Sequence, residues 1–131
     1  MAKVSSSIAK EAYKVEITTP TGNMIIADEP THVGGKNAGF APEELLASAL
    51  AACTSATLRM YADRKNWDLH KVKIDINLDW DKETSKTNLN RKIKLIGNLD
   101  EEQKTKLLWV ANHCPVHKIL SNPIQINTTL E

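Results

Sequence analysis

Apolar and polar residues alternate along several stretches of the chain, and this two-residue period predicts β-strands. The first pair is expected at residues 13–19 and 24–27, with a Pro-Thr-Gly-Asn turn signal between them. A second antiparallel pair is expected at residues 72–80 and 89–95, with one face toward solvent. The alternating positions of its later strand are Leu89, Arg91, Ile93 and Leu95.

Residues 42 to about 66 carry the strongest helix signals. Pro42 stands at the first position, Glu43 and Glu44 occupy the first turn, and basic residues fill the last turns, which complements the helix dipole at both ends. The middle is apolar nearly all round, so we expect this helix to be buried inside the fold or between subunits. One expected face consists of Leu46, Leu50, Cys53, Thr57 and Met60.

The remaining segments complete an α+β pattern. Residues 28–41 contain three glycines and a proline and are expected to form a loop. Asp100 and Gln103 resemble an N-cap pair, and a helix with an apolar stripe follows. A short helix at 115–120 and a closing strand at 124–130 are also predicted. The apolar stripe consists of Leu107, Leu108 and Ala111.

Strands that pair with one another and are segregated from the helices predict an α+β fold class, with antiparallel sheets around a long buried central helix. The length of 131 residues predicts a single domain over residues 1–131. A net charge of +1 provides no broad field for nucleic acid or anionic membrane. The longest uncharged stretch, residues 45–58, is too short for a membrane span. Two cysteines and no apolar leader segment favour a cytoplasmic location, where a disulfide is transient.

The two cysteines stand in different local sequences. Cys53 lies in an alanine-rich helix, where a free cysteine is commonly a small buried hydrophobe. Cys114 precedes Pro115, so its thiol is expected to face the unpaired N–H groups of a new helix, which favour the thiolate. His117 could add an imidazolium on the same face; alternatively, Cys114 only caps the helix and His117 is a solvated surface residue. If the two thiols meet, the chain can cycle between dithiol and disulfide.

A metal site is a weaker alternative. His113, Cys114 and His117 supply three donors within five positions, and Cys53 or His32 could be a fourth. However, the usual zinc spacings are missing, and adjacent ligands usually point apart. We therefore expect no metal and no other cofactor.

Three motifs together resemble the OsmC/Ohr family, named for osmotically induced protein C and organic hydroperoxide resistance protein. They are APEELL at 41–46 leading into AAC at 51–53, RMYADRKNW at 59–67 and ANHCPVH at 111–117. Each motif alone is weak and the combination is specific. The resemblance extends from about residue 27 to the C-terminus.

This resemblance implies a thiol-dependent peroxidase that reduces organic hydroperoxides in oxidative stress defence. It assigns Cys53 as the peroxidatic cysteine, Cys114 as the resolving cysteine and Glu43 as the active-site glutamate. The family fold is an intertwined α+β homodimer with two sites at the subunit interface. The resemblance further implies a lipoyl-type dithiol as reductant, and we expect no nucleic-acid or membrane partner.

One component of the family pattern is absent. The peroxidases use an arginine from the N-terminal strand region to hold the cysteine as thiolate, whereas this chain has no arginine before Arg59. The alternative function is therefore a non-catalytic OsmC-like dimer that senses redox state or binds a small apolar ligand.

The spacing of Glu43 and Cys53 bears on the oligomeric state. Ten residues of one helix separate the two by about 15 Å along the axis and leave them on different faces. They cannot share a site within one straight helix. Either the helix breaks near its start, or Glu43 acts on Cys53 of a partner subunit.

Overall fold

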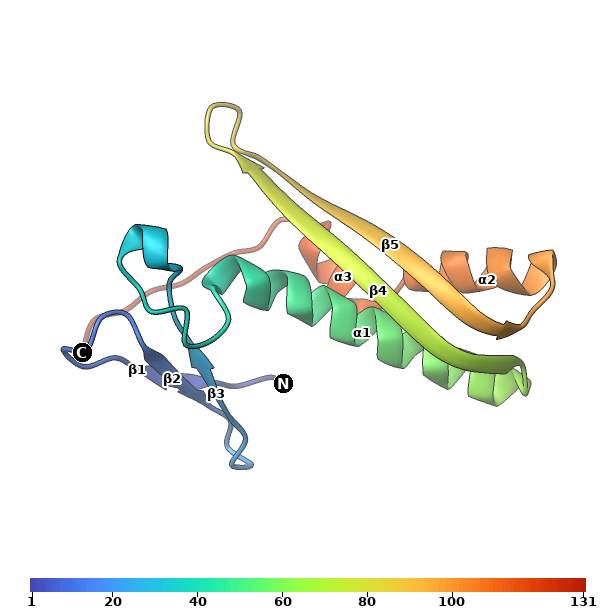
Figure 1. The fold of residues 1–131 in the computed structure, drawn as a ribbon, viewed down its shortest axis with the longest axis horizontal. Coiled ribbons are helices and arrows are strands. Elements are labelled where there is room, and N and C mark those ends of the chain that lie inside the picture. Colours follow the sequence, from blue (N-terminus) through green and yellow to red (C-terminus); the bar gives the residue numbers. More distant parts are fainter. The chain divides into compact units, whose positions relative to one another are not determined.

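The structure is a computed structural model that describes residues 1–131. It contains two compact units, Met1–Leu46 and Ala47–Glu131, which are described separately below. The expectation of a single domain over residues 1–131 stays a prediction. Antiparallel sheets and a long helix confirm the predicted α+β class (Figure 1).

The first unit contains a three-stranded antiparallel sheet in the order β1-β2-β3. Strands β2 (Val15–Thr18) and β3 (Met24–Ala27) form the predicted hairpin, with Ile17 opposite Ile25. Strand β1 (Ser5–Ser7) was not predicted, because a run of serines has no alternation of apolar and polar residues.

A buried carboxylate organises the loop that follows β3. Asp28 accepts hydrogen bonds from the backbone N–H groups of Tyr13, Glu29, Lys36 and Ala38, over distances of 2.8–3.3 Å. The pKa of this carboxyl group is lowered, and the N–H of Ala38 has the largest effect. Burial raises the pKa, and the other three N–H groups lower it further. The predicted loop is thus held by one anion, with a short 3₁₀ turn η1 (Thr31–Val33) inside it.

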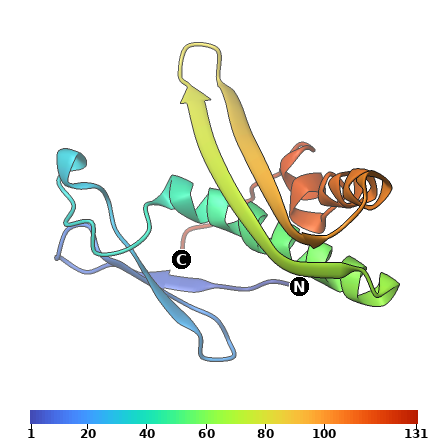
Figure 2. The ribbon, with the colours of Figure 1, turned by 45° about the vertical axis from the view of Figure 1, so that its right-hand side comes forward.

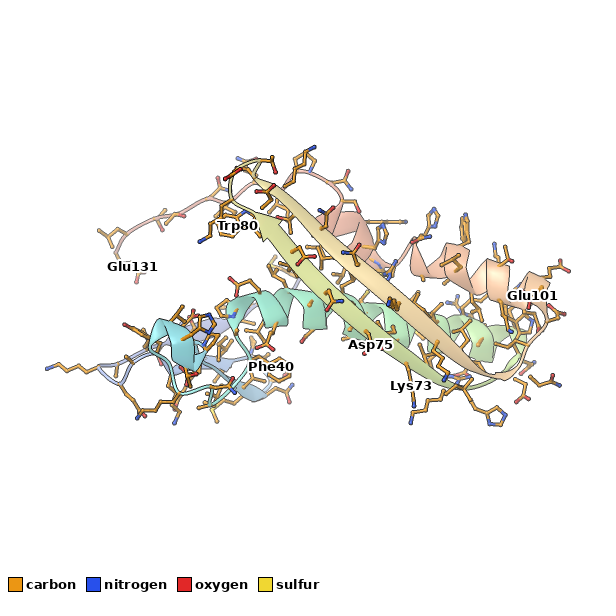
Figure 3. All side chains as sticks on the ribbon, turned by 45° about the horizontal axis from the view of Figure 1, so that its top comes forward. Phe40, Lys73, Asp75, Trp80, Glu101 and Glu131 are labelled. Atoms are coloured by element: carbon orange, nitrogen blue, oxygen red, sulfur yellow. The ribbon has the colours of Figure 1, made fainter.

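The second unit combines a long hairpin with helices. Helix α1 (Pro42–Lys65), most of which belongs to this unit, is followed by β4 (Asp68–Asp81), β5 (Lys86–Asn98), α2 (Glu101–Ala111) and α3 (Pro115–Leu120). The β4–β5 hairpin crosses α1 in both ribbon views (Figures 1 and 2). Its strands alternate as predicted, so that Lys73 and Asp75 lie on the exposed face of β4 (Figure 3).

The core of the second unit lies where α1, α2 and the hairpin meet. Leu58 of α1 packs with Leu107, Val110 and Ala111 of α2, and Ile93 of β5 packs against this cluster. Asp100 and Gln103 form the predicted reciprocal cap at the start of α2, with bonds of 2.7 and 3.0 Å. The predicted stripe of α2 is wrong at Leu108, which is 56% exposed, while Val110 is buried.

The buried face of α1 differs from the predicted one. The buried residues are Leu50, Thr54, Leu58 and Ala62, whereas Leu46 and Met60 are exposed. A helix that is apolar nearly all round has a weak preference for any one face, so tertiary contacts select the face that is buried. Within one chain, the fully buried residues of α1 therefore form a single line along the helix.

The closing strand predicted at 124–130 is wrong for the single chain. No residue beyond α3 is in a strand, and Ile124, Ile126 and Leu130 are exposed. The alternation of this segment suits a strand, but a strand also needs a neighbouring edge for its backbone groups, and this segment pairs with none.

Helix α1 meets the length and composition criteria of a membrane span. It has 24 residues, and its most apolar window has a mean hydropathy of 1.2. The core helix of a soluble protein meets the same criteria, so length and composition do not distinguish the two.

Candidate active site

Cys114 lies at the N-terminus of α3, where the sequence predicts it. Its backbone is extended, Pro115 occupies the first helical turn, and its Sγ accepts the backbone N–H of His117 at 3.4 Å. The thiol is completely buried. The expected contact between the sulfur and an unpaired N–H of the helix is therefore present.

Helix α1 brings Cys53 and Thr54 to this sulfur. The Thr54 Oγ1 lies 3.8 Å from the Cys114 Sγ, and the Thr54 side chain is also completely buried. Cys53 is half-buried, with its Sγ 4.0 Å from the Thr57 Oγ1. The Cys53 side chain is close enough to Cys114 to act on its ionisation. Both cysteines are free thiols. The two side chains are therefore near each other, and no disulfide bond links them.

Strand β5 adds an arginine that the sequence analysis did not assign to the site. Arg91 is paired with Ile76 of β4 and stands on the same face of β5 as Ile93. Its Nη1 donates to the Thr54 Oγ1 at 2.8 Å. Its Nη2 lies 3.1 Å from the Asn112 Oδ1 and 3.0 Å from the His117 Nδ1. One guanidinium thus connects β5, α1, α3 and the end of α2.

These contacts favour the thiolate form of Cys114. Burial has the largest single effect and raises the pKa, because it penalises the charged form. The N–H of His117, the side chains of Thr54 and Cys53, and the positive charge of Arg91 together outweigh burial, so the pKa of Cys114 is lowered. The lowered pKa of Cys114 agrees with the prediction that helix N–H groups favour its thiolate.

His117 differs from the expectation that an imidazolium assists the thiolate. Burial, the positive charge of Arg91 and the nearby His113 lower the pKa of His117. Because Arg91 can only donate, the His117 Nδ1 accepts its hydrogen bond and the ring is neutral. His117 contributes its backbone N–H to the sulfur, and the cation of the site is Arg91.

The donors considered for a metal do not converge. The His113 ring bonds the Trp109 carbonyl at 2.7 Å and stacks on the Trp109 ring. His117 is bonded to Arg91. No group of three or more His, Cys, Asp or Glu side chains is arranged to hold a metal ion.

Glu43 and Arg59 are the other two residues of α1 that bear on the site. Glu43 is exposed in the first turn of α1, and α1 runs without interruption to Lys65. The break near the start of the helix, which was one way to bring Glu43 to Cys53, is therefore absent. Arg59 bonds Asp63 and the carbonyl of Leu69 within the chain.

An open groove of 640 Å³ adjoins this cluster of polar side chains. Arg91, Asn112 and His117 line one part of it, and leucine and isoleucine side chains line another. The apolar lining consists of Leu50, Leu89, Ile93, Leu108 and Leu120. Such a groove suits a small molecule with both an apolar and a polar part.

The sequence contains one signal that points to Arg91. Arg91 occupies an alternating position between Leu89 and Ile93, where an apolar residue is expected. A charged residue at an inward strand position needs a partner, and this one finds three. Thr54 and Asn112 had no comparable signal, because their role depends on which face of each helix meets Arg91.

Comparisons with known proteins agree with this fold. A family model described as OsmC-like protein matches residues 34–129. No curated protein matches the chain. A protein from Psychrobacter arcticus, named for osmotic stress induction and a detoxification response, is 21% identical, with 91% of this chain and 88% of that chain covered and a TM-score of 0.79.

Two further solved structures resemble the chain. The OsmC-like protein of Mycoplasma pneumoniae is 20% identical, with 92% of this chain and 87% of that chain covered and a TM-score of 0.78. The organic hydroperoxide resistance protein OhrB of Bacillus subtilis is 23% identical, with 91% and 89% covered and a TM-score of 0.62. These likenesses concern the fold.

Proposed function

This chain belongs to the OsmC-like protein family, and we propose that it is a cytoplasmic thiol-dependent peroxidase that reduces organic hydroperoxides. The observation that carries the proposal is the meeting of two free thiols, one of them buried beside a cation and a helix N-terminus. The name of the similar Bacillus subtilis protein refers to organic hydroperoxide resistance, which supports this substrate class.

The accessible thiol is the better candidate for attack. Cys53 is half-buried, whereas Cys114 is completely buried, so a peroxide reaches Cys53 first. The Cys114 thiolate takes the proton of the Cys53 thiol. The Cys53 sulfur then attacks the terminal oxygen of the hydroperoxide, an S–O bond forms, and the O–O bond breaks. The alkoxide takes the proton back from Cys114 and leaves as an alcohol.

Cys114 then completes the oxidation. Its thiolate attacks the sulfur of the Cys53 sulfenic acid, an S–S bond forms, and hydroxide leaves and is protonated by solvent. Rapid closure protects Cys53 from over-oxidation, which irreversibly ends thiol catalysis. An external dithiol, of the lipoyl type by family resemblance, restores the two thiols and is itself oxidised to a disulfide.

Steady consumption of an organic hydroperoxide tests this proposal. We expect the protein to consume cumene hydroperoxide continuously with dihydrolipoamide as donor, and to form a Cys53–Cys114 disulfide when the donor is omitted. Peroxide loss and the mass of the linked peptides are the measurements. A disulfide that forms once, without turnover by any dithiol, indicates a redox sensor. Absence of both reactions, with apolar ligand bound, indicates a binding protein.

A homodimer is the second part of the proposal. An uninterrupted α1 leaves Glu43 about 15 Å along the helix from Cys53, so its family role requires the Cys53 of a partner subunit. One chain also leaves large apolar side chains uncovered, including Met60 at 59% and Ile126 at 82% exposure. Exposed apolar surface of this kind is typical of subunit interfaces. The unpaired segment 124–130 can obtain a strand partner from a second copy.

Sedimentation at micromolar concentration is expected to give a species of about twice the chain mass of 14.6 kDa. Glu43→Gln is expected to lower turnover, because the family resemblance places this carboxylate at the active site. Glu44→Gln, one residue away, is the control and should retain turnover. A monomer with full activity contradicts the dimer proposal.

A further inference from the structure

We propose that Arg91 is the positioning residue that holds Cys114 in its thiolate form, acting through the hydroxyl group of Thr54. The catalytic use of this thiolate rests on the proposed function. The arrangement itself is defined by contacts among β5, α1 and α3.

Arg91 is fixed in position by three partners. Asn112 and His117 both bond Nη2, at 3.1 and 3.0 Å, which orients Nη1 toward Thr54 at 2.8 Å. A planar guanidinium presents its donors in a rigid fork, so two bonds on one nitrogen determine the direction of the other. A lysine offers one flexible ammonium group and cannot reproduce this set of contacts.

Thr54 transmits the charge to the sulfur. Its hydroxyl oxygen accepts from Arg91 and lies 3.8 Å from the Cys114 sulfur. The hydroxyl donates its proton to the Leu50 carbonyl at 2.6 Å. The hydroxyl has one proton and two possible acceptors. When Cys114 is a thiolate, the negative sulfur is the stronger acceptor, and the bond from Arg91 polarises the hydroxyl toward it. Both Thr54 and Cys114 are completely buried, so water does not screen this interaction.

The groups that face Cys114 leave Arg91 as the single positive charge. Cys53 and Thr54 approach from α1, and His117 approaches from α3 with its backbone N–H. The His117 ring is held neutral against Arg91, and His113 acts on His117 from the end of α2. The positive charge that acts on the Cys114 sulfur therefore comes from β5.

Ultraviolet absorbance of the thiolate against pH tests the inference. A Cys53→Ser background leaves Cys114 as the only thiol and keeps a donor group beside it. In this background, Arg91→Met is expected to move the appearance of thiolate to higher pH. The matched control is Lys92→Met, which removes one positive charge from the neighbouring, exposed residue on the opposite face of β5. Lys92→Met is expected to titrate like the background.

A second pair of variants, at Thr54, tests the hydroxyl group while Arg91 itself is unchanged. Thr54→Val preserves shape, removes the hydroxyl and should raise the pH at which thiolate appears; Thr54→Ser should restore the original titration. Identical titrations of Arg91→Met, Lys92→Met and Thr54→Val would overturn the inference. The titration does not depend on turnover. A shift of the titration therefore supports the role of Arg91 even if the protein has no peroxidase activity, and that lack of activity contradicts only the proposed function.

Discussion

Replacement of Cys53 by serine is expected to reduce peroxide turnover by about 1,000-fold or more, because removal of a nucleophile eliminates the covalent route. A serine hydroxyl keeps the shape of the side chain but does not form a stable sulfenic acid or a disulfide. The initial rate of cumene hydroperoxide consumption with a dithiol donor is the measurement. Turnover that is unchanged in Cys53→Ser would refute the assignment of the attacking residue.

Two companion variants separate attack from resolution. Cys114→Ser is expected to consume one equivalent of peroxide and stall at the Cys53 sulfenic acid, or to consume a second equivalent and over-oxidise to sulfinic acid, because no thiolate traps the sulfenic acid. Mass spectrometry of Cys53 follows this oxidation. Ala56→Ser introduces the same hydroxyl at an exposed position of α1 and is expected to retain wild-type turnover.

Replacement of Leu107 by alanine is expected to lower the free energy of unfolding by about 2–5 kcal/mol, because it opens a cavity in the core of the second unit. Leu107 of α2 is completely buried in the cluster that α2 forms with α1 and the hairpin. Urea unfolding at a fixed protein concentration is the measurement, since dissociation of a dimer adds to the apparent stability.

Leu108→Ala is the matched control for this prediction. It makes the same change on the same helix, at a side chain that is 56% exposed in one chain. The expected change is about 0.5 kcal/mol or less. Equal losses for the two variants would show that Leu108 is buried in the folded protein and would restore the apolar stripe predicted from the sequence.

The sequence by itself determined the elements whose signals are local. Proline and the acidic residues at its start, and the basic residues at its end, predicted α1 within one residue of its observed end at Lys65. The reciprocal cap of Asp100 and Gln103 and the cap of α3 by Cys114 were also predictable. Such caps involve side chains and backbone groups three residues apart, so their physics is complete within a short segment.

Tertiary structure decided which faces of these elements meet. Helix α1 is apolar nearly all round, and contact with α2 and the hairpin selected the line Leu50, Thr54, Leu58 and Ala62. The same choice brought Thr54 against Cys114 and Arg91, although 37 residues separate Thr54 from Arg91 in the chain. Local patterns contain no information about such a contact, because its energy depends on groups that only folding brings together.

The candidate site divides along the same line. The two cysteines and their contexts were visible in the sequence, as was the helix N-terminus that faces Cys114. The cation could not be assigned, because Arg91 acts from a strand register opposite Ile76 and not from a motif around either thiol. The prediction of a closing strand at 124–130 was wrong because it also depended on a distant segment. A strand forms only where another edge completes its backbone hydrogen bonds.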